Sequence, residues 1–501
     1  MRRLIILSIA LIASPSLGQD LGTEQQRAAG KSVYDAKCAQ CHGIDGAGDG
    51  AAAPYFRPAP RDFTTGTYKF RSSASGELPL DSDLKRSIKE GMPYTGMPAW
   101  PKLNDAEVQN LVYYLKTFNS YFDGPYGNPE ALPTTKPVAM SDESIARGRV
   151  VYEENQCLDC HGELGRGDGK SAPTLEDQWG VHIRPADLTK RWTFRGGATR
   201  EDIYRTFTTG LDGSPMPSYE IDPPEDQWNL VNYVYSLSRD EPKYSTVVVA
   251  SGYDGEISAS RGDEQFAEAT PAYFPVVGQV VVPGRSFFPG VNGIEVRAIY
   301  NADALGIMLS WNDMMADTVG ENSPAVLVPD SASLVADTTV SYSDAVAVQF
   351  PTEPPAGVDR PYFLFGDKRR AVDLWFADLA GTDGRVYLGR GSDDVSETDQ
   401  TLSVSATYEH GAWKVIMVRD RAVEGGASFD EGAFVPIAFS VWDGFYGERG
   451  SKRGISSWYN LYMSPFEVQS PVRDMVAWGF GTFILGIGIV FLVRRKYGQS
   501  A

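Results

Sequence analysis

The chain is poor in cysteine, histidine and positive charge. Its 501 residues include four cysteines, four histidines and 46 lysines and arginines, against 65 acidic residues. The formal net charge of −19 argues against nucleic-acid binding, because phosphates repel an acidic surface. Hydrophobic residues at 42% and charged residues at 22% exclude wholesale disorder. The mean hydropathy of −0.27 excludes a polytopic membrane protein, and the length predicts about three domains.

The N-terminus follows the pattern of a secretory signal over residues 1–18. Arg2 and Arg3 precede a ten-residue apolar stretch, and small residues stand before the expected cleavage site. An N-terminal membrane anchor is the alternative. Ten residues span only ~15 Å as a helix, whereas the hydrocarbon core of a bilayer is ~30 Å thick, which favours cleavage.

The C-terminus carries a second apolar stretch, residues 475–493, which contains no charge and predicts a transmembrane helix. A buried core helix is the alternative. Arg494, Arg495 and Lys496 follow at once and place the C-terminus in the cytoplasm. We therefore expect residues 19–474 in the periplasm, anchored to the cell membrane. This part holds 65 acidic and 41 basic residues, a net charge of −24.

Residues 24–240 contain one pattern twice, at an offset of 119 residues. The segment 38–43 recurs at 157–162, Gly91 at Gly210, and Met97-Pro98 at Met216-Pro217. Two copies of one domain, residues 24–122 and 141–240, are the simplest account, with 123–140 as the linker. Helical periodicity predicts helices at 24–37, 104–118, 141–155 and 224–237. Arg57-Pro58-Ala59 recurs only at Arg184-Pro185-Ala186, which predicts an eight-residue insertion in the second copy.

All four cysteines belong to two C-x-x-C-H motifs, the signature of covalent haem c attachment. Such a cysteine pair forms thioethers to one haem, and the adjacent histidine becomes the proximal iron ligand. The expected groups are Cys38, Cys41 and His42, and Cys157, Cys160 and His161. Met97 and Met216 each follow the first cysteine of their copy by 59 residues and are the expected sixth ligands. His/Met ligation closes the iron to substrates, which suits electron transfer.

Other readings of these motifs explain less. A thioredoxin-like pair needs neither the histidine nor the distal methionine, a disulfide leaves the repeat unexplained, and zinc needs further ligands. Met92 competes with Met97 as a ligand, but Leu211 stands at its equivalent position. His182 is expected in a solvent-facing loop and His410 in a turn between strands. Arg57 and Arg184 are either haem-propionate partners or ordinary surface residues.

Both copies resemble class I cytochrome c domains, over residues 24–122 and 141–240. The resemblance implies a small helical fold around one covalent haem per copy, held by the residues named above. The insertion in the second copy is its one departure from the pattern.

Residues 245–470 change character and predict a β-sandwich. Eight strand-like runs lie between turn signals. They are 276–282, 294–300, 306–311, 345–350, 372–376, 402–408, 413–419 and 436–442. The fold class is therefore two all-α domains, an all-β sandwich and one C-terminal transmembrane helix. This third domain has no cysteine and one histidine, and no catalytic residue is assigned to it.

The third domain resembles the haem-binding domain of ethylbenzene dehydrogenase-type gamma subunits, which serve molybdenum enzymes. The resemblance rests on segments 311–313, 345–351, 372–375 and 438–444. It implies a haem b held by Met and Lys, with Lys452 as the lysine; an exposed loop lysine is the alternative. Where the resemblance places the methionine, before Gly366, this chain has Leu364-Phe365. Met308, Met314 and Met315 are nearby alternatives.

The sequence thus predicts a membrane-anchored periplasmic multihaem cytochrome that exchanges electrons with a respiratory oxidoreductase, such as a molybdenum enzyme, or with a soluble cytochrome. One rival is a dihaem oxidoreductase with one open iron. Another is a cytochrome fused to a haem-free sandwich that binds carbohydrate or protein.

Overall fold

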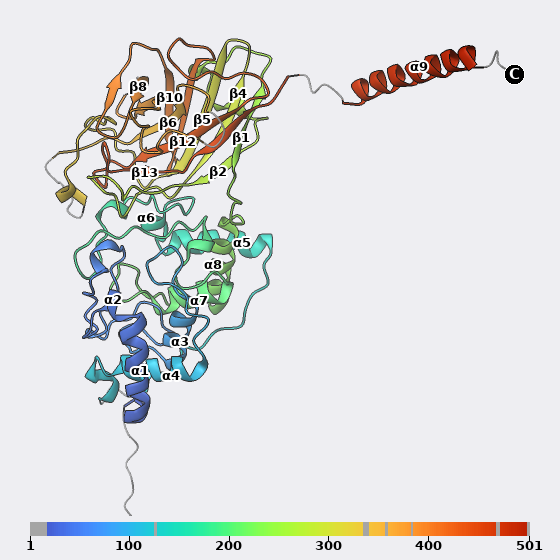
Figure 1. Ribbon diagram of the computed structural model, residues 1–501. Coiled ribbons are helices and arrows are strands. Elements are labelled where there is room, and N and C mark those ends of the chain that lie inside the picture. The colour runs from blue at the N-terminus through green and yellow to red at the C-terminus, as the bar shows by residue number, and fades with distance from the viewer. Residues whose placement is uncertain are drawn as a thin grey trace, which may run out of the picture.

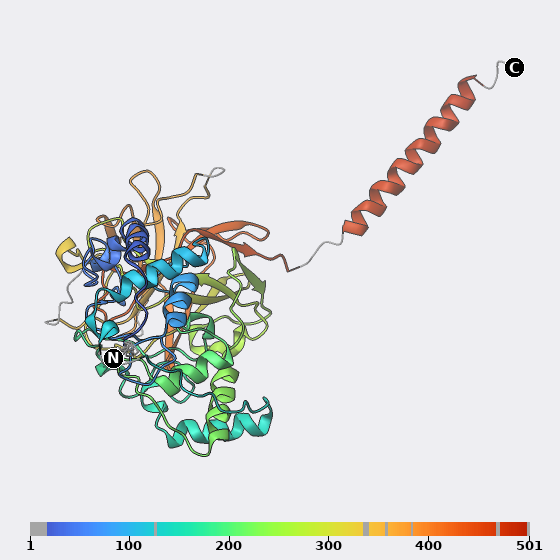
Figure 2. The same cartoon turned by 90° about the horizontal axis from the view of Figure 1, so that it is seen from below.

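The computed structural model describes residues 18–124, 128–333, 340–355, 359–381, 384–466 and 471–497. Figure 1 shows the first helical domain at the bottom, the second helical domain above it and a large β domain at the top. In the view from below, the C-terminal helix stands away from these three domains (Figure 2). The predicted signal segment, apart from Gly18, lies outside the described residues, as do residues 125–127 of the predicted linker.

The first helical domain contains four α-helices and two short 3₁₀ turns. They are α1 (Glu24–Lys37), α2 (Ala39–His42), α3 (Asp81–Glu90), α4 (Asp105–Lys116), η1 (Ala53–Tyr55) and η2 (Ser120–Asp123). A capping box starts α4, in which Asn104 and Glu107 each accept from the other's backbone N–H. The structure thus confirms both predicted helices in this domain, and α3 is an addition.

The second helical domain repeats this plan. Its elements are α5 (Asp142–Glu154), α6 (Leu158–His161), α7 (Arg200–Thr209), α8 (Pro224–Leu237), η3 (Ala172–Thr174) and η4 (Arg191–Thr193). In both domains the first and last long helices cross at a glycine. A Cβ atom on Gly30 would lie 2.0 Å from the Asn110 carbonyl oxygen, and one on Gly148 would lie 1.9 Å from that of Asn229. Both crossings therefore require glycine, which sets the frame around each cysteine motif.

The β domain is one continuous sheet that folds over itself. Its strands are β1 (Val247–Gly252), β2 (Ala272–Pro275), β3 (Val277–Gly278), β4 (Gly293–Tyr300), β5 (Ala304–Asn312), β6 (Ala345–Pro351), β7 (Val372–Asp378), β8 (Gly384–Gly389), β9 (Val395–Glu397), β10 (Ser403–Glu409), β11 (Ala412–Asp420), β12 (Phe434–Trp442), β13 (Gly454–Ile455) and β14 (Tyr459–Met463). The main path runs β10-β11-β5-β4-β1-β14-β12-β6-β7-β8-β9.

Strand β12 forms the corner between the two layers. Its first half, from Phe434 to Ile437, pairs with β14, and its second half, from Ala438 to Trp442, pairs with β6. Leu309 of one layer and Trp375 and Phe439 of the other belong to one buried cluster. The two layers therefore share a core, which confirms the predicted sandwich.

One predicted strand, residues 276–282, is mostly wrong. Only Val277–Gly278 pairs, as β3. Beyond it, the Oε1 atom of Gln279 accepts hydrogen bonds from the backbone N–H groups of Val281 and Val282, at 2.5 and 2.8 Å. These local hydrogen bonds turn the backbone away from the extended conformation that pairing with a neighbouring strand requires.

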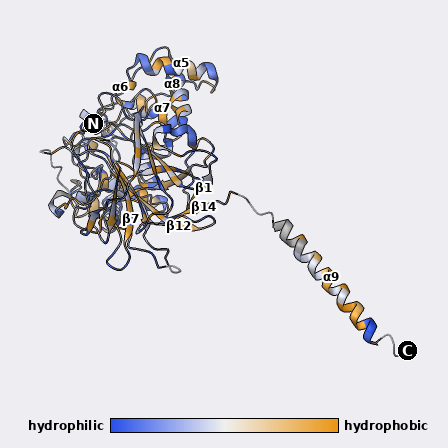
Figure 3. Ribbon diagram, turned by 90° about the horizontal axis from the view of Figure 1, so that it is seen from above, coloured by the Kyte–Doolittle hydropathy of each residue, from blue (hydrophilic) through white to orange (hydrophobic). Residues whose placement is uncertain are grey.

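The C-terminal helix α9 (Pro471–Tyr497) contains the predicted membrane segment. Within it, Trp478–Lys496 is long and apolar enough to cross a membrane, with a mean hydropathy of 1.4, and none of this window is buried against the rest of the protein. Figure 3 shows apolar residues along α9 and polar ones at its end. The helix is therefore consistent with a membrane anchor.

Candidate functional site

Each C-x-x-C-H motif forms one short helix directly after a long one. Cys38 is both the C-cap residue of α1 and the N-cap residue of α2, and Cys157 is the N-cap residue of α6. Gly43 and Gly162 end the short helices with φ of 79° and 80°. Here a Cβ atom would lie about 2 Å from the carboxylate of an aspartate, Asp49 or Asp168, that closes the following loop. The turn thus brings two cysteines and a histidine together in the same way in both domains.

The four cysteines are free, half-buried thiols. Burial raises the pKa of Cys38 and of Cys157 to about 11. These pairs therefore lack the lowered pKa of a redox-active thiol pair. Uncharged, unbridged thiols in a half-buried turn fit thioether attachment of a haem.

Both motif histidines are fixed through Nδ1. The distance from His42 Nδ1 to the Arg61 carbonyl oxygen is 2.9 Å, and that from His161 Nδ1 to the Ala186 carbonyl oxygen is 3.0 Å. This bond orients the ring and leaves Nε2 available for a metal. Burial is the main cause that lowers the pKa of both histidines. A neutral, oriented imidazole fits the role of an axial iron ligand.

The same bonds correct the alignment of the two copies. Arg61 is equivalent to Ala186, and the turns Asp62–Thr64 and Asp187–Thr189 make the same hydrogen bonds. The offset is therefore 125 rather than 127, so the insertion adds six residues instead of the predicted eight. Arg57 and Arg184 do not correspond, because the shared Arg-Pro-Ala letters fall at different places in the loop.

Met97 and Met216 occupy equivalent turns. The Met97 carbonyl accepts from the Met92 N–H at 3.0 Å, and the Met216 carbonyl accepts from the Leu211 N–H at 3.0 Å. Both methionines are half-buried, and Met216 contacts the core of its domain. This geometry supports the pairing of Met92 with Leu211 and leaves Met97 as the counterpart of Met216.

A group of three cations between the helical domains was missed in the sequence. Arg61, Lys69 and Arg195 are half-buried, and the Arg61 guanidinium lies 5.1 Å from the Trp179 ring centroid. Burial, and then the charges of Arg61 and Arg195, lower the pKa of Lys69 to about 8. Asp177 is their acidic neighbour. Such a cationic group suits an anion, and a haem carries two propionates.

The sequence left Arg57 and Arg184 as either haem-propionate partners or surface residues, and the structure directs both of them to the β domain. The guanidinium of Arg57 lies 4.9 Å from the Phe288 ring centroid. Arg184 donates to the Gly290 carbonyl at 3.0 Å. Both contacts join segments more than 100 residues apart, so their local sequence carries no sign of them.

The two remaining histidines also lie at the contact with the β domain. His182, expected to face solvent, is half-buried: its Nε2 lies 3.0 Å from the Ala172 carbonyl oxygen and its Nδ1 lies 3.2 Å from the Tyr446 hydroxyl. That expectation is wrong because the inserted loop packs on Tyr446. His410 does occupy the predicted turn, between β10 and β11, and its carbonyl accepts from Arg166 at 2.7 Å.

The residues implied for a haem b lie in buried packing contacts of the sandwich. Lys452 is 8% exposed, and its Nζ donates to the Tyr446 carbonyl at 3.1 Å. Leu364 and Phe365 are fully buried, and the Arg453 guanidinium lies 3.7 Å from the Phe365 ring centroid. Met308 packs elsewhere, against Phe266 and Ile416. Leu364, Phe365 and Met308 are taken up by packing, and a haem b at Lys452 stays a prediction from the resemblance.

Comparison with known proteins decides the nature of the helical repeat. Residues 27–119 and 145–238 each match the family model for cytochrome c. Both segments are cytochrome c domains. Two cytochrome c domains carry two covalent haems c, and the chain is a dihaem c-type cytochrome with a β-sandwich and a C-terminal apolar helix.

Similar proteins occur in respiratory complexes. The chain is 26% identical over 214 residues to a Haloferax mediterranei protein named as a haem subunit of respiratory nitrate reductase, a match that covers 42% of this chain and 70% of that protein. It is 25% identical over 205 residues to subunit CcoP of a cbb3-type cytochrome c oxidase from an Azospirillum species. This match covers 38% of the chain and 55% of that subunit.

A solved structure also resembles the chain. A chain of the Kuenenia stuttgartiensis reducing HAO-like protein complex is 40% identical, with a TM-score of 0.41. The match covers 44% of the present cytochrome and 99% of that chain.

Proposed function

We propose that this dihaem cytochrome is a membrane-anchored electron carrier of the periplasm that serves a respiratory oxidoreductase. The observation that carries the proposal is the repeated geometry of the two motifs, each with an oriented histidine and a distal methionine turn. A covalently held haem c supplies one-electron redox chemistry. The protein supplies the axial ligands, the hydrogen bonds behind them and the apolar surroundings.

We assign Cys38, Cys41, His42 and Met97 to the first haem and Cys157, Cys160, His161 and Met216 to the second. Arg61, Lys69 and Arg195 are proposed to face propionate carboxylates, because this half-buried cationic group lies between the two cytochrome domains. A position between the domains would keep the two redox centres close to one another.

The helix α9 supports attachment to the cell membrane, with the cytochrome domains and the sandwich on the periplasmic side. Its charged end, Arg494 to Lys496, favours the cytoplasm. A tether holds the carrier near a membrane-bound partner and raises its effective concentration there.

The proposed partner is a respiratory oxidoreductase, and its proposed type is a molybdenum enzyme. Two observations support this choice: the resemblance of the sandwich to gamma subunits of such enzymes, and the similar protein that is named as a nitrate reductase haem subunit.

The experiment that tests the proposal has two parts. The dithionite-reduced protein is exposed to carbon monoxide at neutral pH; an unchanged Soret band is expected, because both irons are closed by methionine. The detergent-solubilised protein is also isolated from its native membrane, and a respiratory oxidoreductase is expected among the copurifying proteins. Binding of carbon monoxide by the reduced protein would instead favour a dihaem enzyme with an open iron.

A further inference from the structure

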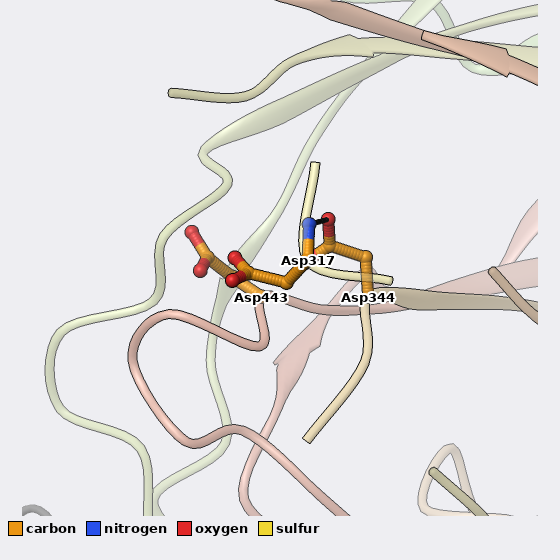
Figure 4. A group of neighbouring side chains, drawn as sticks. All are labelled: Asp317, Asp344 and Asp443. Carbon is orange, nitrogen blue, oxygen red and sulfur yellow. Dashed lines mark hydrogen bonds between the residues drawn. The ribbon is translucent and has the colours of Figure 1, made fainter. Parts of the chain in front are cut away.

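Three strand ends of the sandwich bring acidic side chains together beside the second cytochrome domain. Asp317 follows β5, Asp344 precedes β6 and Asp443 follows β12. One carboxylate oxygen of each residue lies within 4.8 Å of those of the other two. Figure 4 shows the three side chains converging from separate segments, with the Asp317 N–H donating to Asp344. Such a group of oxygens is the ligand type that hard divalent cations prefer.

A fourth carboxylate, Asp313, is buried in the same region and poorly hydrogen-bonded. Its side chain is 1% exposed, and its nearest donors, the N–H groups of Met314 and Met315 and Nε1 of Trp311, do not reach hydrogen-bond geometry. Next to burial itself, its negative charge is the largest cause that raises the pKa of Asp344 and of Asp443. The buried Oδ2 atom of Asp317 also lacks a partner. A buried carboxylate without a partner is costly, and a bound cation would supply the missing contacts.

The cations of the chain do not balance this charge. The guanidinium of Arg184, from the second cytochrome domain, lowers the pKa of Asp313 and of Asp443. Yet among the described residues none of the four aspartates forms an ion pair within 4.0 Å. Burial is the main cause that raises the pKa of Asp317 to about 6 and that of Asp344 to about 8.

We propose that Asp317, Asp344 and Asp443 bind one Ca²⁺ ion, with Asp313 as a fourth carboxylate. Ca²⁺ takes six to eight oxygen ligands in a flexible geometry, whereas Mg²⁺ demands a near-ideal octahedron and keeps several of its waters, so a site made of several protein carboxylates suits the larger ion. The ion would tie the ends of β5, β6 and β12 together at the surface on which the second cytochrome domain packs.

A bound ion would also hold in place the part of the sandwich that Arg184 contacts. This arginine donates to the Gly290 carbonyl, and a Cβ atom on Gly290 would lie 1.8 Å from the Asp443 carboxylate. Two residues further along, the Ala186 carbonyl holds His161. Calcium would thus stabilise the contact between the sandwich and the loop behind a haem ligand.

The test uses the full-length haem-loaded protein in detergent, stripped with EGTA and desalted at pH 7. Calorimetric titration with CaCl₂ is expected to show one saturable site per chain, and Ca²⁺ is expected to raise the unfolding temperature of the stripped protein. MgCl₂ at the same concentration is expected to have much less effect. Absence of saturable binding would mean that the carboxylates are simply protonated, and would overturn the proposal. Equal binding of Mg²⁺ would overturn the assignment of calcium.

Asp317→Asn is the diagnostic variant, because Asp317 is the least buried of the three proposed ligands and its loss disturbs packing least. The expected result is a weakening of calcium affinity by about tenfold or more. Asp254→Asn, an exposed aspartate of the same domain, is the matched control and is expected to bind as the wild type does. Equal calcium affinity of the two variants would contradict the site. If Asp317→Asn fails to fold, elemental analysis of the wild type decides: one calcium per two irons supports the site, and none refutes it.

Discussion

The Nδ1 atom of His161 lies 3.0 Å from the carbonyl oxygen of Ala186. Arg184, two residues before Ala186 in the same loop, donates a hydrogen bond to the Gly290 carbonyl of the sandwich. The second cytochrome domain is therefore joined to the sandwich by the very segment that orients its proposed iron ligand. In the first domain the equivalent residue, Arg61, packs on Trp179 of the second domain. The segment behind each histidine thus contacts the next domain along the chain through an arginine side chain.

Replacing a distal methionine should open one iron. In Met97→Ala and in Met216→Ala, the reduced protein is expected to bind carbon monoxide at about half of its haem, because no thioether fills the sixth position. The measurement is the Soret shift on titration with carbon monoxide.

Met92→Ala is the matched control and should leave the protein closed to carbon monoxide, since Met92 corresponds to Leu211. If Met92→Ala binds the gas and Met97→Ala does not, the ligand assignment in the first domain is wrong.

Asp212→Asn should loosen the contact between the two cytochrome domains. Asp212 is the ionic partner of Arg71, whose side chain is fully buried, with a distance of 2.8 Å between Arg71 Nη2 and Asp212 Oδ1. Its loss removes the main counter-charge of a buried cation, which Asp83 and Glu77 replace only in part, and is expected to cost about 3 kcal/mol of unfolding free energy. Urea unfolding followed by circular dichroism measures this cost.

The control for that variant is Asp35→Asn, which removes an exposed pair with Lys31. Its expected cost is much smaller, because water screens an exposed ion pair. Equal costs for the two variants would show that Arg71 gains nothing from Asp212.

The pair of Arg147 and Asp226 should make the second cytochrome domain sensitive to acid. Arg147 joins α5 to α8 by donating to both oxygens of Asp226, and these hydrogen bonds are the main cause that lowers the pKa of Asp226. A carboxyl whose pKa is lowered in the folded protein contributes stability above its unfolded pKa of ~3.9 and loses that contribution as the pH falls further.

Asp226→Asn is therefore expected to lower the unfolding free energy by about 1 kcal/mol at pH 7, a modest value because Arg147 is partly exposed. At pH 3 the gap between variant and wild type should shrink. The check is urea unfolding at both values of pH, with Glu153→Gln as an exposed control. A gap that stays constant or widens in acid would contradict this account.

Removal of α9 should release the protein from the membrane. The window Trp478–Lys496 has no surface buried against the three domains, so a chain ending at residue 466 is expected to fold with both haems and to appear in the soluble periplasmic fraction. Cell fractionation with haem staining measures the distribution. A truncated protein that stays in the membrane would point to a second site of attachment.

The sequence predicted the local structure well where the signal is local. The helices predicted at 24–37 and 224–237 follow from short-range pattern, and the structure has them as α1 and α8 with the same bounds. The strand predicted at 276–282 is mostly wrong, because the Gln279 side chain accepts hydrogen bonds from the backbone N–H groups of Val281 and Val282.

The contacts between domains could not be predicted, because they join residues distant in the chain. Nothing around His182 signals Tyr446, which lies 264 residues later. Arg184 and Arg57 both begin an Arg-Pro-Ala segment, yet the hydrogen bonds of the loop show that the two residues are not equivalent. The aspartates near β5, β6 and β12 are unremarkable among 65 acidic residues until the sheet brings them together.

The central claim is that two C-x-x-C-H turns each hold one covalent haem. Its most direct measurement is the pyridine haemochrome spectrum, with protein quantified independently, of material matured in a host competent for haem attachment. Two haems c per wild-type chain are predicted, and one in the variant with both Cys157 and Cys160 changed to alanine. Fewer than two haems in the wild type, with bare thiols at either motif, would contradict the account.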